Sequence, residues 1–279
     1  MSVLMGTETD SQLELEAAAG FTKIVVGLEV DESSFEATRQ ASLLLEQNGL
    51  LTLIAAYQPL AAVPAWGAYS IGYIEPELRK TLKQDAIKKL WMAEQVATRA
   101  KPGELIQAKT KDEATAAALV DAAIEQGADL IAIGAPKSGR LWGILSGQTA
   151  TFVLHRAPCS VLVARAPVIS AFKRITVGID GSPTSARALE VARTIAKQCK
   201  AELHVVAAYG GFELDLDAVE ALDPAYTSSA NDPVDALLGF AGESDLLVVG
   251  SRGLKGLRSL GSVSERVAHE AVCSVLVVR

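Results

Sequence analysis

The sequence is poor in aromatic residues, cysteine and long apolar runs, and each shortage excludes a class of protein. Only 5 % of the 279 residues are aromatic, and the three cysteines form no Cys-x-x-Cys pair. An odd number of unpaired cysteines gives neither a disulfide framework nor a zinc site. No segment reaches the roughly 18 to 20 uninterrupted apolar residues of a transmembrane helix. The GxSxG, HExxH and GxxxxGK[ST] motifs are absent too, so hydrolase, metalloprotease and Walker-type interpretations have no support.

Positive charge is also scarce. The 26 Lys and Arg face 33 Asp and Glu, which gives a net charge of −7 and argues against a nucleic-acid partner, because phosphate binding needs clustered cations. Residues 1–20 contain Glu8, Asp10, Glu14 and Glu16 but no Lys or Arg, so they lack the regions of a secretory signal. We therefore expect a disordered leader over residues 1–20 and a cytoplasmic protein with no membrane partner.

An internal repeat organises the rest of the chain. FTKIVVG at 21–27 aligns with FKRITVG at 172–178, and APCSVLVAR at 157–165 aligns with AVCSVLVVR at 271–279. Short apolar runs alternate with helix-period stretches in both copies, which is typical of a parallel sheet covered by helices. The sequence predicts an α/β protein with one domain at 21–166, a second at 171–279 and a linker marked by Pro167.

The expected elements follow from these patterns. In the first copy they are strands at 24–28, 51–56, 130–133 and 160–163 and helices at 33–47, 75–100, 113–126 and 148–155. In the second copy they are strands at 175–179, 203–207, 246–249 and 275–278 and helices at 185–197, 233–242 and 262–270. The second copy lacks a counterpart of the long 75–100 helix. An acidic segment with at most a short helix takes its place.

Four segments of the second copy occur in the order found in a known family: VGID at 177–180, GSRG at 250–253, GSVSERV at 261–267 and SVLVV at 274–278. The chain resembles the universal stress protein family, tandem-domain type. The resemblance implies two doubly wound five-stranded parallel sheets of the Rossmann-like, adenine nucleotide alpha hydrolase-like class, the second copy being truncated. It also implies an internal pseudo-dimer of the two domains, often joined through their last strands, which would cover an otherwise open hydrophobic edge.

The nucleotide-binding branch of that family carries a Gly-x2-Gly-x9-Gly-Ser/Thr pattern, in which backbone amides approach phosphate oxygens. The second copy has these residues, but its spacer between Gly253 and Gly261 is two residues short. The resemblance implies that Asp180 contacts adenosine and that Val205 lies against adenine. The candidate cofactor is ATP, with Mg²⁺, and the residues expected to bind it are Asp180, Gly181, Val205, Val249, Gly250, Arg252, Gly253, Gly261, Ser262 and Val263.

Each of these residues also has a plainer interpretation. Ser262 followed by Glu265 is a capping box, in which the hydroxyl satisfies the first helical amides. The glycines can serve turns. The cations Arg252, Lys255 and Arg258, which suit a triphosphate, can equally be solvated.

The first copy departs further from the pattern. Glu29 replaces the adenosine-contacting acid, Val30 replaces the following glycine, Lys137 replaces the second glycine of the loop and Gln148 replaces the Ser/Thr. We therefore expect a structural role for this copy. Its long helix and a loop with Trp66, Tyr69 and Tyr73 are available to cover an interface or a ligand, although most such aromatic residues serve packing.

Other candidate chemistry is thin. Cys159 and Cys273 stand at matching places before apolar runs and are expected to be buried. His155 and His269 also match, and a helix-end role is favoured over catalysis. The cluster Glu213, Asp215, Asp217, Glu220 and Asp223 lacks the spacing of a calcium loop, so a solvated acidic segment is favoured over a metal site.

The favoured function is a stress-response regulator, not an enzyme, that binds adenine nucleotide in the second domain and passes that state to unidentified protein partners as a homodimer. The alternative is a nucleotide-independent stress protein that acts through protein contacts or binds another small ligand in the first domain. A third function, an adenylyltransferase-like enzyme or slow ATPase, finds no motif in the sequence.

Overall fold

The computed structural model describes residues 20–29, 32–57, 71–135, 147–165, 169–210, 214–251 and 260–279, without the side chains of 71–75 and 147–148. The predictions that concern residues 1–19, Val30, Trp66, Tyr69, Lys137, Arg252, Gly253, Lys255, Arg258 and Glu213, or the side chains of Tyr73 and Gln148, lie outside this part of the chain. No helix within it is both long and apolar enough to cross a membrane.

The two repeats follow the same order of elements. The first contains β1 (Phe21–Leu28), α2 (Ser33–Leu44), β2 (Leu45–Ala56), α3 (Ile71–Ala100), β3 (Leu105–Lys111), α4 (Thr115–Gln126), β4 (Leu130–Gly134), α5 (Gly147–Arg156) and β5 (Ser160–Ala164). The second contains β6 (Arg174–Ile179), α6 (Pro183–Cys199), β7 (Glu202–Ala208), α7 (Leu216–Leu222), β8 (Thr227–Ser229), α8 (Pro233–Ala241), β9 (Leu246–Gly250), α9 (Ser262–Glu270) and β10 (Ser274–Val278). The predicted α/β class is confirmed.

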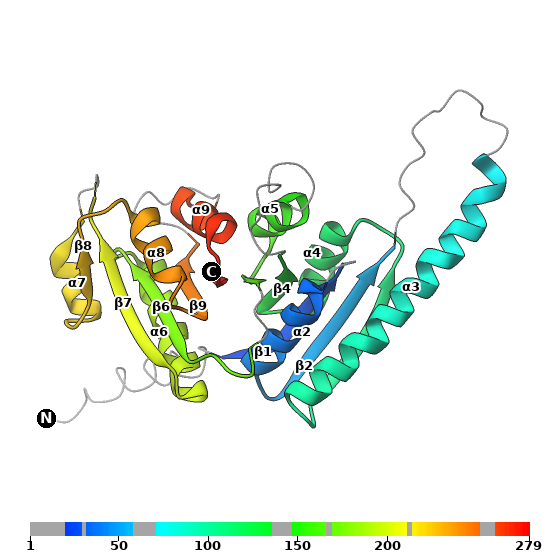
Figure 1. Cartoon of the computed structure of the whole chain (residues 1–279), viewed down its shortest axis with the longest axis horizontal. Coiled ribbons are helices and arrows are strands. Elements are labelled where there is room, and N and C mark those ends of the chain that lie inside the picture. Colours follow the sequence, from blue (N-terminus) through cyan, green and yellow to red (C-terminus); the bar gives the residue numbers. More distant parts are fainter. Residues whose placement is uncertain are drawn as a thin grey trace, which may run out of the picture.

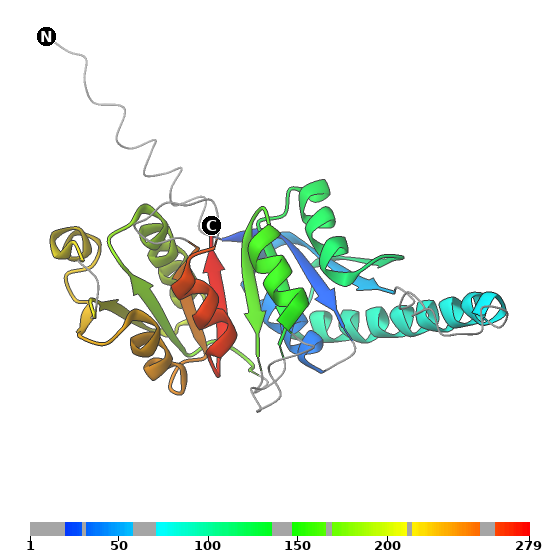
Figure 2. The same ribbon diagram turned by 90° about the horizontal axis from the view of Figure 1, so that it is seen from above.

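The strands form one continuous sheet of ten strands, in the order β3-β2-β1-β4-β5-β10-β9-β6-β7-β8. Within each half, the five strands are parallel. The halves meet where β5 and β10 pair antiparallel, with Leu162 opposite Leu276 (Figure 2). The expected edge-to-edge pseudo-dimer is thereby confirmed, and the last strand of the chain is buried in the middle of the sheet instead of forming an open edge.

Helices cover both faces of this sheet. Buried residues of α2, α3, α6 and α7 share one apolar cluster, and those of α4, α5, α8 and α9 share the other. Neighbouring side chains along a strand point to opposite faces, so one strand can contribute to both clusters. Each cluster contains residues of both repeats. The two halves therefore have a common core across the seam between β5 and β10.

Three features of the fold differ from the sequence-based expectation. The first helix ends at Leu44 instead of residue 47, because the chain becomes extended at Leu45 and enters β2 there. Strands β3 and β8 are not among the four strands expected in each copy. Both lie at the outer ends of the sheet, where every side chain of the strand is exposed or only partly buried and most are polar, so no apolar run marks the strand.

The acidic segment of the second repeat contains the short helix that the sequence allowed for. Helix α7 spans seven residues, against thirty in α3, its counterpart in the first repeat. Asp215 caps α7 by accepting from the amide of Ala218, and Asp223 pairs with Arg193 of α6. Figure 1 shows α7 and α3 at opposite ends of the molecule.

Two arginines at equivalent positions of the repeats form hydrogen bonds across the seam, one from each side. Each follows the last strand of its repeat: the Arg165 guanidinium donates to the carbonyls of Ala268, His269 and Cys273 in the second repeat, and the Arg279 guanidinium donates to that of Leu154 in the first. The amides of the two arginines donate to Ser274 Oγ and Ser160 Oγ. The repeat in the sequence thus becomes a pseudo-twofold interface.

The paired histidines lie in the last turns of α5 and α9, as expected, but their contacts cross the seam. His155 Nε2 lies 3.1 Å from Oε1 of Glu265, and His269 Nε2 lies 3.2 Å from Oγ1 of Thr151. Thr151 and Glu265 occupy equivalent positions of the repeat. The two histidines therefore lie at the helix ends, as the sequence favoured, and in addition they link α5 to α9.

Candidate functional site

The order of strands places a candidate site in each repeat. After β6 the chain passes to β7 on one side, whereas β9 lies on the other side of β6, so the chain changes direction between β6 and β9. Ligands of such sheets bind at this point, outside the carboxyl ends of the strands. The equivalent point in the first repeat lies between β1 and β4.

The turn after β6 is held by its own polar residues. The amide of Asp180 donates to Oγ of Ser185 at 3.2 Å, and Asp180 Oδ1 accepts from the amide of Ser182 at 3.0 Å. Ser182 caps α6 by accepting from the amide of Ser185. Gly181 between them has a φ of 77°, a conformation that glycine adopts without strain. Asp180 is thereby fixed at the carboxyl edge, with one carboxylate oxygen engaged in the turn.

The end of β9 and the start of α9 lie together at the same edge. The amide of Gly261 donates to the carbonyl of Ser251 at 2.8 Å, and Ser264 Oγ donates to the carbonyl of Gly250 at 2.6 Å. These bonds place the N-terminus of α9 directly beside the end of β9. The amides of a helix N-terminus and its dipole favour an anion.

The first glycine of the pattern has a packing role. A Cβ atom on Gly250 would lie 2.9 Å from the backbone carbon and oxygen of Thr184 in the first turn of α6, and one on Gly134 would lie 2.4 Å from the backbone of Ser33. Both repeats therefore need glycine here for the strand end to approach the helix. This contact explains why Gly134 is present in the first repeat although the rest of the glycine pattern is not.

The capping box does not form. Gly261 is the N-cap of α9 and has no side chain to accept a hydrogen bond, while Ser262 is the first helical residue and is exposed. Glu265 contacts His155 across the seam instead of returning to the N-cap. The exposed Ser262 hydroxyl at the carboxyl edge remains suitably placed for a phosphate.

The three candidate valines do not gather on one surface. Val205 is buried in the cluster on the α6 side of the sheet, whereas Val249 is buried in the opposite cluster, against which Val263 packs. In the strand register Val205 lies opposite Val177, three residues before Asp180, and thus below the carboxyl edge. These side chains line the core beneath the candidate site.

Tyr209 is a residue of this edge that the sequence analysis did not single out. It follows β7 directly, and its side chain is 43 % exposed. Since Ile179 lies opposite Ala207 in the register, Tyr209 follows its strand at the level of Gly181. An aromatic residue immediately after a predicted strand was the available signal, because the carboxyl ends of parallel strands collect ligands.

Helix α7 closes one side of the candidate site. A Cβ atom on Gly181 would lie 3.0 Å from Cβ of Ala218 and 3.6 Å from the carbonyl oxygen of Asp215. The short helix therefore packs on the turn that holds Asp180. This contact leaves less room on the adenosine side than an open turn would.

The first repeat keeps part of this framework and carries the longer acid Glu29 in place of Asp180. The amide of Glu29 donates to Oγ of Ser34 at 2.9 Å, which matches the bond from Asp180 to Ser185. The amide of Ala135 donates to the carbonyl of Ala164, as that of Ser251 does to Val278. The two repeats share the framework of the edge and differ in the side chains placed on it.

Cys159 and Cys273 are buried, as predicted. Burial raises the pKa of the Cys159 thiol to about 12 and that of the Cys273 thiol to about 11. Both thiols stay protonated at neutral pH, so neither is a nucleophile.

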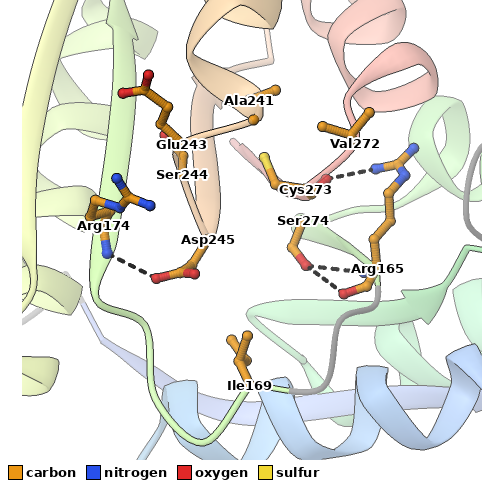
Figure 3. A pocket seen from close by; sticks show the side chains of 11 residues that line it. Arg165, Ile169, Arg174, Ala241, Glu243, Ser244, Asp245, Val272, Cys273 and Ser274 are labelled. Atoms are coloured by element: carbon orange, nitrogen blue, oxygen red, sulfur yellow. Dashed lines mark hydrogen bonds between the residues drawn. The ribbon is translucent and has the colours of Figure 1, made fainter.

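A cavity of about 230 Å³ lies at the opposite edge of the second half-sheet, beside the seam (Figure 3). Asp245 accepts there from the amides of Lys173 and Arg174, and Ser274 Oγ accepts from the amide of Arg165. Burial lowers the pKa of Arg165 to about 10, and its guanidinium turns away toward the Cys273 carbonyl. The polar groups of the cavity thus link the start of β9 to that of β6, and the start of β10 to the residue after β5. The cavity is therefore separate from the candidate site at the carboxyl edge of the second half-sheet.

The comparison with known families and proteins agrees with this architecture. The model of the universal stress protein family matches residues 20–165, 171–232 and 227–279. A universal stress protein of Mycolicibacterium smegmatis is 28 % identical over 211 residues, which cover 63 % of this chain and 70 % of that protein. Universal stress protein YxiE of Bacillus subtilis is 31 % identical over 147 residues, 39 % of this chain and 99 % of its own.

Among solved structures, a universal stress protein of Archaeoglobus fulgidus superposes with a TM-score of 0.67 at 19 % identity, covering 92 % of this chain and 96 % of its own. That likeness extends across both repeats and supports the tandem architecture. Together with the family match over nearly all of the described residues, it leads to one conclusion: the chain belongs to the universal stress protein family, in its tandem-domain form.

Proposed function

We propose that the second repeat binds an adenine nucleotide, ATP with Mg²⁺, and that the chain is a cytoplasmic stress-response regulator, not an enzyme. The observation that supports this most directly is the meeting of two segments at one edge. The end of β9 packs on the first turn of α6 at Gly250, so Asp180 and the N-terminus of α9 flank the same point of the sheet. This arrangement supports a site in which a carboxylate would bind the nucleoside and helical amides would bind the phosphates.

In this proposal Asp180 binds the ribose or base with its remaining carboxylate oxygen. Ser262 and Val263 present backbone amides to the phosphates, and Gly261, whose own amide donates to Ser251, begins the helix beside them without a side chain. Arg252 and Gly253, which lie outside the described residues, belong to the same proposal as candidate phosphate-binding residues. Tyr209 offers an aromatic surface at the same edge. Val205 and Val249 support the site from the core beneath it.

Calorimetric titration with ATP and Mg²⁺ tests the proposal, with one site per chain as the expected result. Asp180→Asn keeps an oxygen that accepts from Ser182 but removes the charge, and should weaken binding about tenfold or more. Glu29→Gln in the first repeat is the matched control and should leave the affinity unchanged. The absence of heat at millimolar nucleotide, together with no nucleotide in native mass spectra of the purified protein, would refute the proposal.

The second candidate is a nucleotide-independent stress protein that acts through protein contacts or binds another small ligand in the first domain. The packing of α7 on Gly181 favours it, because Ala218 and Asp215 narrow the adenosine side. A crystal structure grown with ATP would discriminate between the two, since the nucleotide candidate requires density beside Asp180 and the other requires an empty edge.

We also propose that the chain forms a homodimer and that its protein partners bind this assembly. The domain limits of 21–166 and 171–279 belong to the same proposal. Limited proteolysis should cut first between the two limits, around Pro167, and after residue 20.

A further inference from the structure

Helix α3 carries an exposed stripe that faces neither the sheet nor another described helix. Ala86, Leu90, Ala93 and Ala97 form its buried side. Lys80, Lys83, Ile87 and Trp91 are exposed and lie three, seven and eleven residues along, which puts them on one other face of the helix. We call these four residues the α3 stripe.

The stripe combines positive charge with unusual apolar exposure. Ile87 is 51 % and Trp91 62 % exposed. A tryptophan exposed to that extent beside a second large apolar residue is typical of a contact surface, because such anchors contribute most of the energy of an interface. Two lysines next to them call for a partner surface with negative charge.

A surface of that kind lies at the other end of the same chain. On α7, Leu216 is 51 % exposed, and Asp217 and Glu220 are exposed on the same side of the helix. We call these three residues the α7 face. The two surfaces complement each other in charge, and each adds an apolar side chain.

The two surfaces of one chain cannot meet. β3, beside α3, and β8, beside α7, are the outermost strands of the ten-stranded sheet, and Figure 1 shows the two helices at opposite ends. Only another copy can therefore bring an α7 face to an α3 stripe. Two chains in which each α7 face met the α3 stripe of the other would make the contact twice and close the assembly, as a twofold dimer does.

We propose that the α3 stripe of one chain binds the α7 face of a second copy. The inference rests on the proposed homodimer, for which it supplies the contact surface, and it does not depend on nucleotide binding. The proposed contact also accounts for the difference between the repeats, because the long helix α3 belongs to the first repeat and the acidic helix α7 to the second.

Sedimentation velocity of the full chain over a concentration series, at about 0.05 and 0.5 M salt, tests the proposal. The wild type should form dimers that weaken at high salt. K80E/K83E should raise the dissociation constant at least tenfold, and so should W91S. K88E/R99E is the matched control, because it changes the charge equally at exposed positions of α3 outside the stripe, and it should behave as the wild type.

The decisive variant is K80E/K83E/D217K/E220K, in which the charges of the two surfaces are exchanged. It should recover dimer formation, which a merely destabilised chain would not do. A single chain at every concentration, a dimer indifferent to K80E/K83E, or no recovery in the exchanged variant would overturn the proposal. Flotation of the wild type with anionic vesicles, without dimer formation, would overturn it in favour of a membrane surface. Titration with ATP in parallel separates these outcomes from a failure of the nucleotide site.

Discussion

Arg165 and Arg279 make the same contact from opposite sides of the seam. Each donates from its guanidinium to a carbonyl near the end of the other repeat's last helix, at Ala268 and at Leu154. Positive charge at a helix C-terminus is stabilised by the exposed carbonyls and the dipole. The two arginines therefore tie each terminal helix to the neighbouring repeat and hold the halves of the sheet together.

Replacing Arg165 by Met should destabilise the whole chain. Its side chain is buried and donates to three backbone carbonyls, which would lose their donor in an apolar surrounding. We expect the free energy of unfolding to fall by about 2 to 5 kcal/mol. Urea unfolding followed by circular dichroism measures the effect. R279M should cost less because Arg279 is half-buried; an R165M chain as stable as the wild type would contradict the account.

Stability should decline as the pH falls below about 6.5, in part through His269. Burial lowers the pKa of His269 below 6.5, and Arg165 and His155 act in the same direction, while Glu265 and Glu270 oppose them. A histidine with a lowered pKa binds more protons when unfolded, so its contribution is complete above the unfolded pKa and is lost as the pH falls through 6.5 toward the folded value.

The measurement is the difference in unfolding free energy between the wild type and H269Q at several pH values. That difference should shrink from pH 7.5 to pH 5.5. A pH-independent difference for H269Q would show that the imidazole does not titrate differently in the folded chain.

The three cysteines should react in a fixed order. Cys159 and Cys273 are buried, whereas Cys199 is only half-buried. Burial raises the pKa of all three thiols, to about 12 for Cys159 and about 11 for Cys273. Iodoacetamide at neutral pH should label Cys199 first and leave the other two unmodified in the native chain. Mass spectrometry of tryptic peptides reads the sites, and labelling of all three in guanidinium is the control. Early labelling of Cys159 or Cys273 would show that the seam opens.

Gly250→Ala should destabilise the chain even without nucleotide. The added Cβ would meet the backbone of Thr184 at 2.9 Å, and the same change at Gly134 would meet that of Ser33 at 2.4 Å. We expect a loss of about 1 to 3 kcal/mol for each variant in thermal or urea unfolding.

Gly239→Ala in α8 is the control, because nothing lies within 4 Å of the added atom. It should stabilise the chain by about 0.5 to 1 kcal/mol through helix propensity. If G250A were as stable as the wild type, the packing role of Gly250 against Thr184 would be refuted. A loss of nucleotide binding in G250A can therefore be interpreted only together with the unfolding free energy of the same variant.

The candidate site was predictable in outline. Parallel strands bring their carboxyl ends to one edge, so Asp180 and Gly261 could be assigned to the same edge from their order in the sequence. Which residues face a ligand was not predictable. Val205 and Val249 are buried on opposite faces of the sheet, and Gly250 is required by the close approach of the Thr184 backbone. Those facts depend on backbone approaches between segments far apart in the chain.

The sequence by itself determined the two repeats, the alternation of strands and helices and the shortening of the second copy, because apolar periodicity and self-similarity are local properties. The family resemblance pointed to a junction through the last strands. Only the tertiary structure decided that β5 and β10 pair antiparallel there and that Arg165 and His155 contact the other repeat. These contacts link residues more than 100 positions apart. No local pattern specifies such a pair; it arises when two complete half-sheets bury their last strands against each other.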